Sequence, residues 1–160
     1  MRKRSFPPLV NSYTKVLILG SLPGDKSLEK NEYYAHPQNR FWKIFNSLFH
    51  TEDTTNYAEK INLLVKNNIG LWDVCAEASR PGSMDLAIQH ERPNQIIELL
   101  KNYPSITQIV FNGQKAHNLY LKHFDKREGI IYRCLPSTSP ANAKSNLENL
   151  IEHWRIIISD

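Results

Sequence analysis

Short apolar segments alternate with amphipathic segments along almost the whole chain, and this pattern restricts the fold more than any other feature. Four of the apolar segments have the length of buried strands: Lys15 to Leu19, Gly70 to Val74, Gln108 to Phe111 and Ile130 to Cys134. Helical spacing of apolar residues is found at Pro37 to Phe49, Asn56 to Lys66, Pro93 to Asn102, Gln114 to His123 and Asn142 to Ile157. The alternation predicts an α/β fold whose parallel sheet is covered by helices on both faces.

Composition limits the organisation and the location of the protein. With 160 residues, 41% of them hydrophobic, the chain fits one globular domain, residues 1–160, and no repeat or linker divides it. No apolar run approaches the roughly 20 residues that cross a bilayer, so we expect a cytoplasmic protein without a membrane partner. The basic start, Arg2-Lys3-Arg4, is expected to be a mobile, solvated terminus.

Cysteine and histidine usage gives no sign of a metal or a cofactor. Cys75 and Cys134 are the only cysteines, and both lie in apolar segments, so we expect two buried small side chains. The six histidines show no metal-ligand spacing. The net charge of +4 and the sequence pI near 9.1 fit a polyanionic partner without identifying one.

Polar turns follow the predicted strands. Gly-Ser-Leu-Pro-Gly at 20–24 follows the first strand, and Leu-Pro-Ser-Thr-Ser-Pro at 135–140 follows the last. Parallel strands end at one edge of a sheet, where ligands bind and free backbone N–H groups can meet phosphate. The candidate site residues at this edge are Ser21 to Gly24, Asp73, Asn112 and Ser137 to Ser139. The alternative interpretation is a set of tight turns without a ligand.

The segment from Tyr33 to Trp42 combines polar and aromatic side chains. Pro37 has the position of a first-turn helix residue, so we expect Gln38, Asn39 and Arg40 to lie in the first turn and face a cleft. The aromatic residues after them have the spacing of core residues. Alternatively, Asn39 only bonds local backbone.

These segments resemble the uracil-DNA glycosylase superfamily and, within it, the hypoxanthine (deoxyinosine) DNA glycosylases. The resemblance rests on GSLPG at 20–24, YYAHPQNRFW at 33–42, LWDVC at 71–75, RPGSMD at 80–85, FNG at 111–113 and LPSTSPAN at 135–142. It implies a three-layer α/β/α sandwich around a central, mostly parallel four-stranded sheet. It also implies a monomeric, monofunctional DNA glycosylase that needs no cofactor or metal and acts on DNA containing deaminated bases, hypoxanthine first.

Two departures from the superfamily pattern decide where catalysis is expected. Several branches carry a catalytic Asp or Asn at the third position of the first turn, where this chain has Leu22, and the uracil-specific branch opens the second turn with His, where this chain has Leu135. The resemblance therefore assigns the essential amide to Asn39. Its side-chain oxygen is expected to hold the attacking water, and backbone N–H groups at Ser21 and Leu22 to stabilise the departing base.

The resemblance also implies how the base is read. Asp73 occupies the position of a base-reading Asn, and as a carboxylate it would accept the ring N–H of hypoxanthine and repel the bare ring nitrogen of adenine. Uracil presents the same donor and acceptor order. Asn112 is the second base-binding candidate, and either Tyr34 or Phe111 is expected to stack on the base, each being equally typical of a core.

Contacts to DNA outside the base are expected from the two turns. Gly20, Ser137, Thr138 and Ser139 are the candidates for binding phosphate. The loop from Pro140 to Lys144 is the candidate for entering the minor groove, although Ala141 and Asn142 are small for a wedge.

Two other functions fit the same residues. The first is a glycosylase of this fold that prefers uracil or xanthine, which a side-by-side assay of deaminated bases would separate from the hypoxanthine enzyme. The second is a catalytically silent module that binds nucleic acid or nucleotides, for which replacing Asn39 would change nothing.

Overall fold

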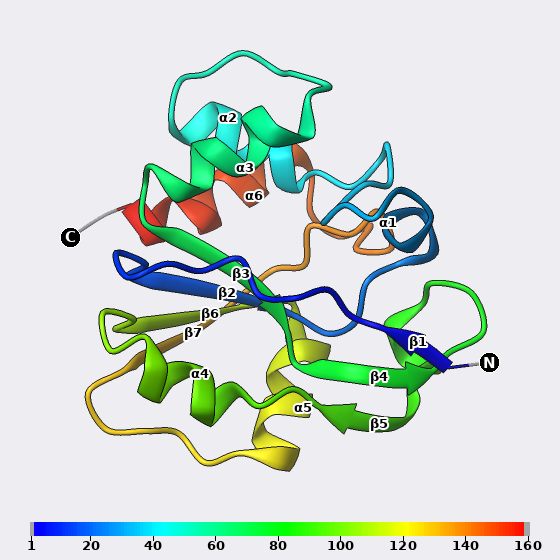
Figure 1. The fold of residues 1–160 in the computed structure, drawn as a ribbon. Helices are drawn as coiled ribbons and strands as arrows, with labels where there is room; N and C mark the ends of the chain where they lie inside the picture. The colour runs from blue at the N-terminus through cyan, green and yellow to red at the C-terminus, as the bar shows by residue number, and fades with distance from the viewer. Residues whose placement is uncertain (1, 159–160) are drawn as a thin grey trace.

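The computed structural model describes residues 2–158 and has a parallel sheet between two layers of helices (Figure 1). The strands of this sheet are β2 (Val16–Gly20), β3 (Ile69–Asp73), β6 (Gln108–Asn112) and β7 (Ile131–Leu135), in the order β3-β2-β6-β7 and all parallel. Helices α2 (Phe41–Leu48), α3 (Tyr57–Val65) and α6 (Leu147–Trp154) cover one face, and α4 (Ile96–Asn102) and α5 (Gln114–His123) cover the other. The predicted α/β sandwich is confirmed.

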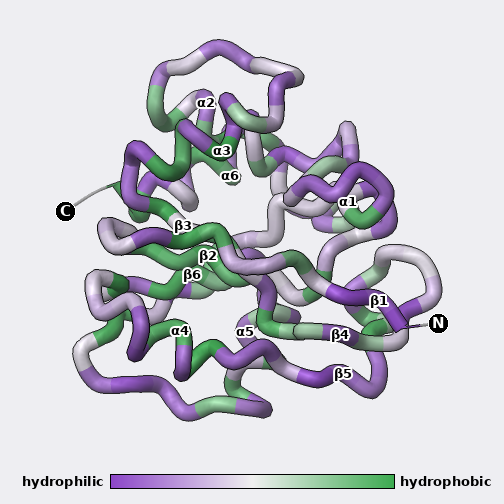
Figure 2. Tube along the Cα trace, viewed as in Figure 1, coloured by the Kyte–Doolittle hydropathy of each residue, from purple (hydrophilic) through white to green (hydrophobic). Residues whose placement is uncertain are grey.

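Alternating side chains of the strands supply a core on each face of the sheet. In β2, Leu17 and Leu19 pack with α4 and α5, whereas Ile18 packs with α2, α3 and α6. Figure 2 shows the hydrophobic residues gathered along the sheet and the helix sides that face it. Phe41 and Phe45 are fully buried, and each contributes about 1.5–3 kcal/mol to stability.

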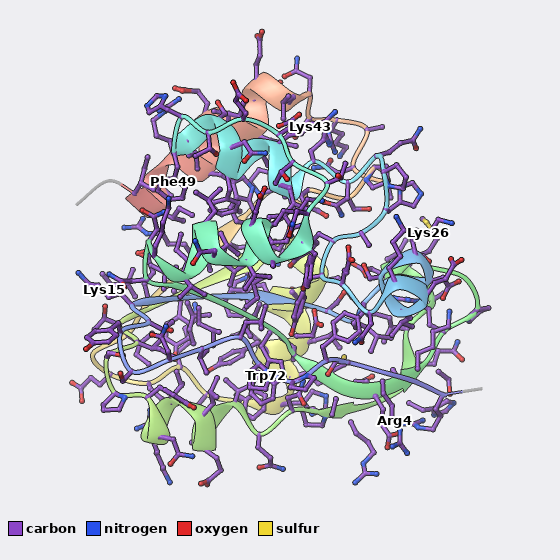
Figure 3. The ribbon with its side chains drawn as sticks, turned by 45° about the horizontal axis from the view of Figure 1, so that its top comes forward. Arg4, Lys15, Lys26, Lys43, Phe49 and Trp72 are labelled. Carbon is purple, nitrogen blue, oxygen red and sulfur yellow. The ribbon has the colours of Figure 1, made fainter. Side chains whose placement is uncertain are left out.

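Several lysine side chains lie on the outside of this arrangement. The exposed Lys15, Lys26 and Lys43 lie at the periphery of the molecule, whereas Trp72 lies inside it (Figure 3). In the part of the chain that the structure describes, no helix has the length and apolar character to span a membrane.

The chain before β2 protects one edge of the sheet. Leu9 and Leu71 exchange backbone hydrogen bonds of 2.9 and 3.0 Å, and the Trp72 indole donates to the Phe6 carbonyl at 3.0 Å. Every residue of β3 is buried as a result. Gly70 permits this approach, because a Cβ there would lie 2.7 Å from the Leu9 carbonyl oxygen.

The opposite edge differs from the prediction of four buried strands. β7 pairs only with β6 within the sheet, and most of its residues are exposed or half-buried. Cys134 is exposed, so the expectation that both cysteines are buried is wrong for this one, whereas Cys75 is fully buried. The apolar composition of the segment did not distinguish an edge strand from a central one.

A second sheet was not predicted. It consists of three antiparallel strands, β1 (Arg2–Arg4), β4 (Cys75–Ser79) and β5 (Gln89–Pro93), in the order β1-β4-β5. The expectation of a mobile start is therefore wrong for residues 2–4. Glu77 of β4 explains the ordering, because its carboxylate forms ion pairs with Arg2, Arg4 and Arg92 at 3.4, 3.5 and 2.8 Å. Met1 lies outside the described residues.

Three helices begin later than predicted, and short elements complete the fold. Helix α2 begins at Phe41 rather than Pro37, α4 at Ile96 because Pro93 ends β5, and α6 at Leu147, where the Asn146 side chain accepts the Asn149 N–H. The remaining elements are helix α1 (Asp25–Lys30) and the 3-10 turns η1 (Asp85–Ala87) and η2 (Arg155–Ile158).

We predict that Gly70→Ala destabilises the fold by roughly 1–3 kcal/mol, because the new methyl group overlaps backbone at Leu9 and lies 2.9 Å from the Val10 side chain. Urea denaturation measures the loss. Gly24→Ala is the matched control, since its Cβ would meet the nearest atoms, those of Ser83, at an ordinary 3.6–3.7 Å. Equal midpoints for the two variants would contradict the tight approach.

Candidate active site

The carboxyl ends of the parallel strands open into a pocket of about 830 Å³. Its wall combines the turn after β2, the ends of β3 and β6, the turn after β7 and the segment before α2. The predicted site residues found in this wall are Gly20, Ser21, Leu22, Tyr34, Asn39, Asp73, Asn112, Ser137, Thr138 and Ser139. Residues more than 100 positions apart in the sequence thus meet at one edge of the sheet.

The two aromatic candidates occupy different places. Phe111 does not line the pocket: it is fully buried, and its ring stacks on His117 with centroids 4.7 Å apart. Tyr34 does line the pocket and stacks on Phe41 at 4.1 Å. Its φ of +54° lies in the left-handed region, an unusual conformation for an aromatic residue that is often found at functional sites.

Asp73 ends β3 as a buried carboxyl group without a matching donor. Its side chain lies in the pocket wall, and Oδ2 has no hydrogen-bond partner among the described residues. Gly20 allows this placement, since a Cβ there would lie 2.6 Å from Asp73 Oδ1 and 3.2 Å from the Tyr34 hydroxyl. Burial, and to a smaller extent nearby Asp85, raise the pKa of Asp73 to about 7, although Arg80 opposes the shift.

The Asn39 carboxamide is held by a chain of hydrogen bonds. The Asn112 side-chain amide forms two hydrogen bonds with Thr138: Oδ1 accepts the Thr138 N–H at 3.0 Å, and Nδ2 donates to the Thr138 hydroxyl at 3.1 Å. That hydroxyl donates to Asn39 Oδ1 at 2.8 Å, and Oδ1 also accepts the Phe41 N–H at 3.0 Å. Because the Phe41 N–H can only donate, the side-chain atom of Asn39 that faces it must be the oxygen and not the nitrogen.

This geometry changes two expectations about Asn39. The residue precedes helix α2 instead of lying in its first turn, because its side chain takes the Phe41 N–H. Two protein donors already occupy its oxygen, which was expected to hold the water. The amide NH2 has no acceptor among the described residues, so it is the part of Asn39 that can reach a substrate.

Thr138 and Asn112 form the hydrogen bonds that hold Asn39. Thr138 is fully buried, and its backbone N–H and its side-chain hydroxyl both donate hydrogen bonds within the protein. The side chain of Asn112 is likewise committed to Thr138, which leaves little capacity for base binding. Ser137 and Ser139 remain half-buried at the pocket wall.

Two arginines fix the turns that frame the pocket. The Arg40 guanidinium donates to the carbonyls of Thr138, Ser139, Asn142 and Ser145 in the second turn and the loop after it. One side chain thereby replaces the regular backbone pairing that this loop lacks.

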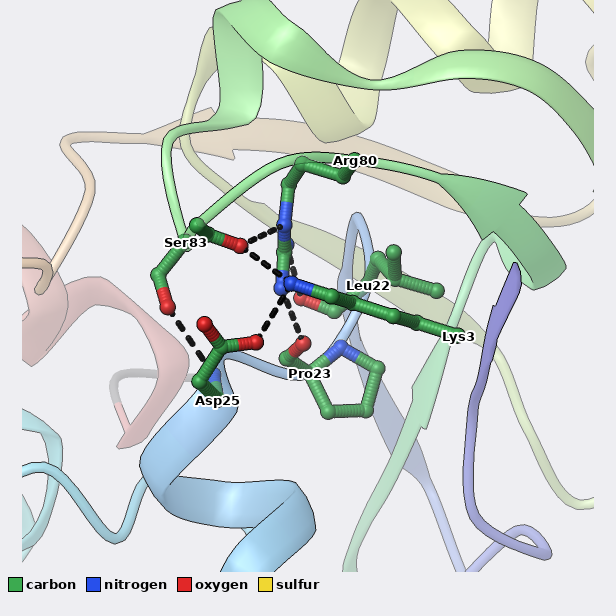
Figure 4. A network of polar contacts seen from close by, with 7 residues as sticks. Lys3, Leu22, Pro23, Asp25, Arg80 and Ser83 are labelled. Atoms are coloured by element: carbon green, nitrogen blue, oxygen red, sulfur yellow. Dashed lines mark hydrogen bonds and ion pairs between the residues drawn. The ribbon is translucent and has the colours of Figure 1, made fainter. Parts of the chain in front are cut away.

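Arg80, which is 2% exposed, does the same for the first turn (Figure 4). Its guanidinium donates to the carbonyls of Leu22 and Pro23 at 3.4 and 2.6 Å and to that of Gly82 at 2.9 Å. Lys3 also reaches the Gly82 carbonyl. The strand formed by the start of the chain therefore supports the pocket wall.

Asp85 joins the same wall. The Ser21 hydroxyl donates to Asp85 Oδ1 at 2.7 Å, so this hydroxyl is not free for phosphate. Burial raises the pKa of Asp85, and the Ser21 hydrogen bond and Arg80 oppose that shift. Arg80 and Asp85 both lie in the RPGSMD segment, but no property of that segment alone predicted these contacts.

The pocket wall carries charges of both signs, and the described residues hold no metal cluster. Lys26, Lys115 and Lys144 line the wall, and so do Asp25, Asp73 and Asp85. Within residues 2–158, no group of three or more His, Cys, Asp or Glu side chains is arranged to bind a metal ion. The three lysines are the groups of this wall that can attract a phosphate.

Comparison with known proteins gives consistent matches over nearly the full length. The family model described as the uracil DNA glycosylase superfamily matches residues 7–157. A hypoxanthine DNA glycosylase of Methanosarcina barkeri is 38% identical over 146 residues, 91% of each chain. A protein of the same name from Methanosarcina acetivorans is 36% identical over 158 residues, 98% of each chain.

A solved structure agrees with these matches. It is a solution NMR structure from Methanosarcina acetivorans, described as a candidate uracil DNA glycosylase. The two chains share 36% sequence identity and superpose with a TM-score of 0.82, covering 98% of this chain and 96% of the other.

We predict that Asp73→Asn makes the protein more stable at pH 8. An unfolded Asp ionises near pH 4, whereas Asp73 in the fold keeps its proton up to about pH 7. Between these values the folded state binds more protons, so rising pH destabilises the wild type by up to roughly 4 kcal/mol. Asn removes this cost, and its advantage should shrink as the pH falls from 7 to 4. Asp125→Asn, on the surface, controls for the lost charge.

Urea denaturation of the three proteins at pH 5 and pH 8 measures this effect. An Asp73→Asn protein that gains nothing between pH 5 and pH 8 would contradict the burial of an unpaired carboxyl group.

Proposed function

Because the chain belongs to the uracil DNA glycosylase superfamily, we propose that it is a monofunctional DNA glycosylase, formed by residues 1–160, that removes hypoxanthine from DNA. The observation that carries the proposal is the Asn39 carboxamide, held by Thr138 and Phe41 with its NH2 group at the pocket wall. The superfamily positions that elsewhere carry catalytic groups hold Leu22 and Leu135 here, which leaves this amide as the polar group for the chemistry.

The size and place of the pocket fit an extruded nucleotide. A volume of about 830 Å³ is within the usual range for small-molecule sites, and the lysines at its wall suit the DNA backbone. A base inside a duplex must leave the stack to enter such a pocket, at a cost of a few kcal/mol that is smaller for weak pairs. Pairs containing hypoxanthine are weak, which favours their selection.

The reaction exchanges one bond for another. The bond between C1′ and the base nitrogen breaks, its electron pair leaves with the base, and the oxygen of water bonds to C1′ and loses a proton as the base gains one. We assign the water to the Asn39 NH2 group, which donates to the water oxygen and holds it below the sugar. A neutral amide is a poor base, so placement is its main contribution.

Leaving-group stabilisation is assigned to the first turn. Ser21 and Leu22 line the pocket, their backbone N–H groups are the proposed donors, and Arg80 fixes this turn through the carbonyls of Leu22 and Pro23. Donors that are already in place stabilise the developing anion without reorganisation. Gly20, Ser137 and Ser139 are the proposed contacts to the flanking phosphates.

Base recognition is assigned to Asp73. Its carboxyl group lines the pocket, and Oδ2 has no hydrogen-bond partner among the described residues; in the ionised form this carboxyl group accepts the ring N–H of hypoxanthine and repels the bare ring nitrogen of adenine. Uracil offers the same N–H and carbonyl order, so uracil belongs in the same assay. Tyr34, with its ring in the pocket wall, is the proposed stacking partner. The monomeric state and the cytoplasmic location stay predictions.

Asn39→Ala should reduce the rate of hypoxanthine release from deoxyinosine-containing DNA by at least about 10²-fold, because no side chain then holds the attacking water in place. Single-turnover cleavage with excess enzyme measures the rate, and circular dichroism shows whether the fold persists. Asn102→Ala, at the exposed end of α4, is the matched control and should keep full activity. A folded Asn39→Ala protein that releases hypoxanthine at the wild-type rate would contradict the proposed mechanism.

At pH 8, where the Asp73 carboxyl group is mostly ionised, Asp73→Asn should lower the preference for hypoxanthine over adenine by about tenfold or more, since an amide can pair with either base and no longer repels adenine. Single-stranded oligonucleotides with one hypoxanthine, uracil or adenine target report the three rates. An unchanged ratio would show that backbone groups, not Asp73, read the base.

A further inference from the structure

One lysine of the pocket wall differs from the other two. Lys115 is half-buried, whereas Lys26 and Lys144 are exposed. Lys26 also pairs with Glu29 at 3.4 Å, but Lys115 forms neither an ion pair nor a hydrogen bond with any other residue in the range 2–158. A partly buried ammonium group without an anion in contact has lost part of its hydration and has gained no partner in exchange.

The helix that carries Lys115 gives no reason for a cation at this position. The residue lies in the first turn of α5, which starts at Gln114, and no acidic side chain lies in that turn. A helix dipole is positive at this end, so it repels a cation instead of stabilising it. Side chains of a helix tilt toward its N-terminus, which directs Lys115 toward the carboxyl edge of the sheet and into the pocket wall.

The charge of Lys115 acts on the side of the pocket that contains the first turn. Burial raises the pKa of Asp85 and that of Cys75, and the Lys115 ammonium group opposes both shifts. Asp85 in turn accepts the Ser21 hydroxyl at 2.7 Å. Lys115 therefore lies near the turn whose backbone N–H groups are the proposed donors to the departing base.

The acidic side chains of the same wall leave this ammonium group available. Asp25, which lines the wall, pairs with Lys3. Burial raises the pKa of Asp73 and that of Asp85, so both carry less negative charge near neutral pH than exposed aspartates do. None of the three forms an ion pair with Lys115. An anion that enters the pocket can therefore become the partner that Lys115 lacks.

We propose that Lys115 is a catalytic residue that stabilises the negative charge of the departing base. The inference rests on the proposed glycosylase function and goes beyond it by adding a cation to the neutral donors of the first turn. The ammonium group keeps its proton and acts through its charge, while the electron pair of the broken bond moves onto the base. A charge inside a pocket stabilises an anion more strongly than a charge in water, which distinguishes Lys115 from the exposed Lys26 and Lys144.

A comparison of two leaving groups tests this role. Lys115→Met should lower the single-turnover rate of hypoxanthine release at saturating enzyme by at least about tenfold. The base of 8-aza-2′-deoxyinosine keeps the N–H and carbonyl of hypoxanthine but is a better leaving group. Its release should lose at least about threefold less, because a more stable anion needs less stabilisation from the protein.

Two further variants control for charge and for position. Lys115→Arg keeps the positive charge and should retain most of the rate. Lys101→Met removes an exposed lysine from the last turn of α4 and should change neither rate. Circular dichroism shows whether each variant is folded.

Binding separates this role from contact with a phosphate. On a duplex with an uncleaved 2′-fluoro analogue of deoxyinosine, Lys115→Met should keep a dissociation constant within about threefold of wild type and the same salt dependence, both of which a lost phosphate contact would change. Equal losses on the two bases, no loss of rate, a loss confined to affinity, or a folded Lys115→Arg protein as slow as Lys115→Met would overturn the assignment. Wild-type protein that releases neither base would instead overturn the proposed function, and the role of Lys115 with it.

Discussion

The hydrogen bond from the Thr138 hydroxyl to Asn39 Oδ1 joins the parts of the molecule on which the site depends. Thr138 belongs to the turn after β7, Asn39 to the segment before α2, and Asn112, which orients Thr138, to the end of β6. All three residues lie at the carboxyl edge of one parallel sheet. The bond holds the Asn39 oxygen, which leaves the amide NH2 group for the pocket. It can form only when β6 and β7 pair correctly and when the turn after β7 and the segment before α2 have their native conformation.

Buried charge is the second constraint on the site. Asp73 is buried and Asp85 half-buried, burial raises the pKa of each, and the Arg80 charge opposes both shifts, joined at Asp85 by Lys115. The Arg80 guanidinium donates its hydrogen bonds to the carbonyls of Leu22, Pro23 and Gly82. The same group therefore offsets the negative charge of the two aspartates and fixes the backbone of the first turn. Asp73 is left without a donor of its own, and an unsatisfied buried group of this kind is stabilised when a ligand supplies the missing N–H.

Much of the fold follows from local patterns in the sequence. The parallel strands and the helices that cover them were predicted because apolar spacing reports which residues face a core. β4 and β5 were missed because both are short: Cys75–Ser79 has only small apolar residues, and Gln89–Pro93 is polar. The pairing of β4 with β5 and with the start of the chain is a tertiary event. The start of α2 was misplaced by four residues because a side-chain acceptor at Asn39 competes with helix formation.

The site was predictable in its location and less so in its roles. Strand ends and polar turns placed most of its residues, but Phe111 and Tyr34 could not be distinguished by composition, and only the packing of Phe111 on His117 removes it from the pocket. The functions of Arg40 and Arg80 depend on carbonyls about 100 and nearly 60 residues away, respectively, and no local pattern encodes such contacts.

A double-mutant cycle on Thr138 and Asn39 tests the central hydrogen bond most directly. Thr138→Val keeps the shape and removes the hydroxyl, Thr138→Ser keeps the hydroxyl, and each is combined with Asn39→Ala in single-turnover hypoxanthine release. If the bond positions the amide, Val lowers the rate, Ser does not, and Val has no further effect once Asn39 is Ala. Losses that simply add, or a Val variant as active as the wild type, would contradict it.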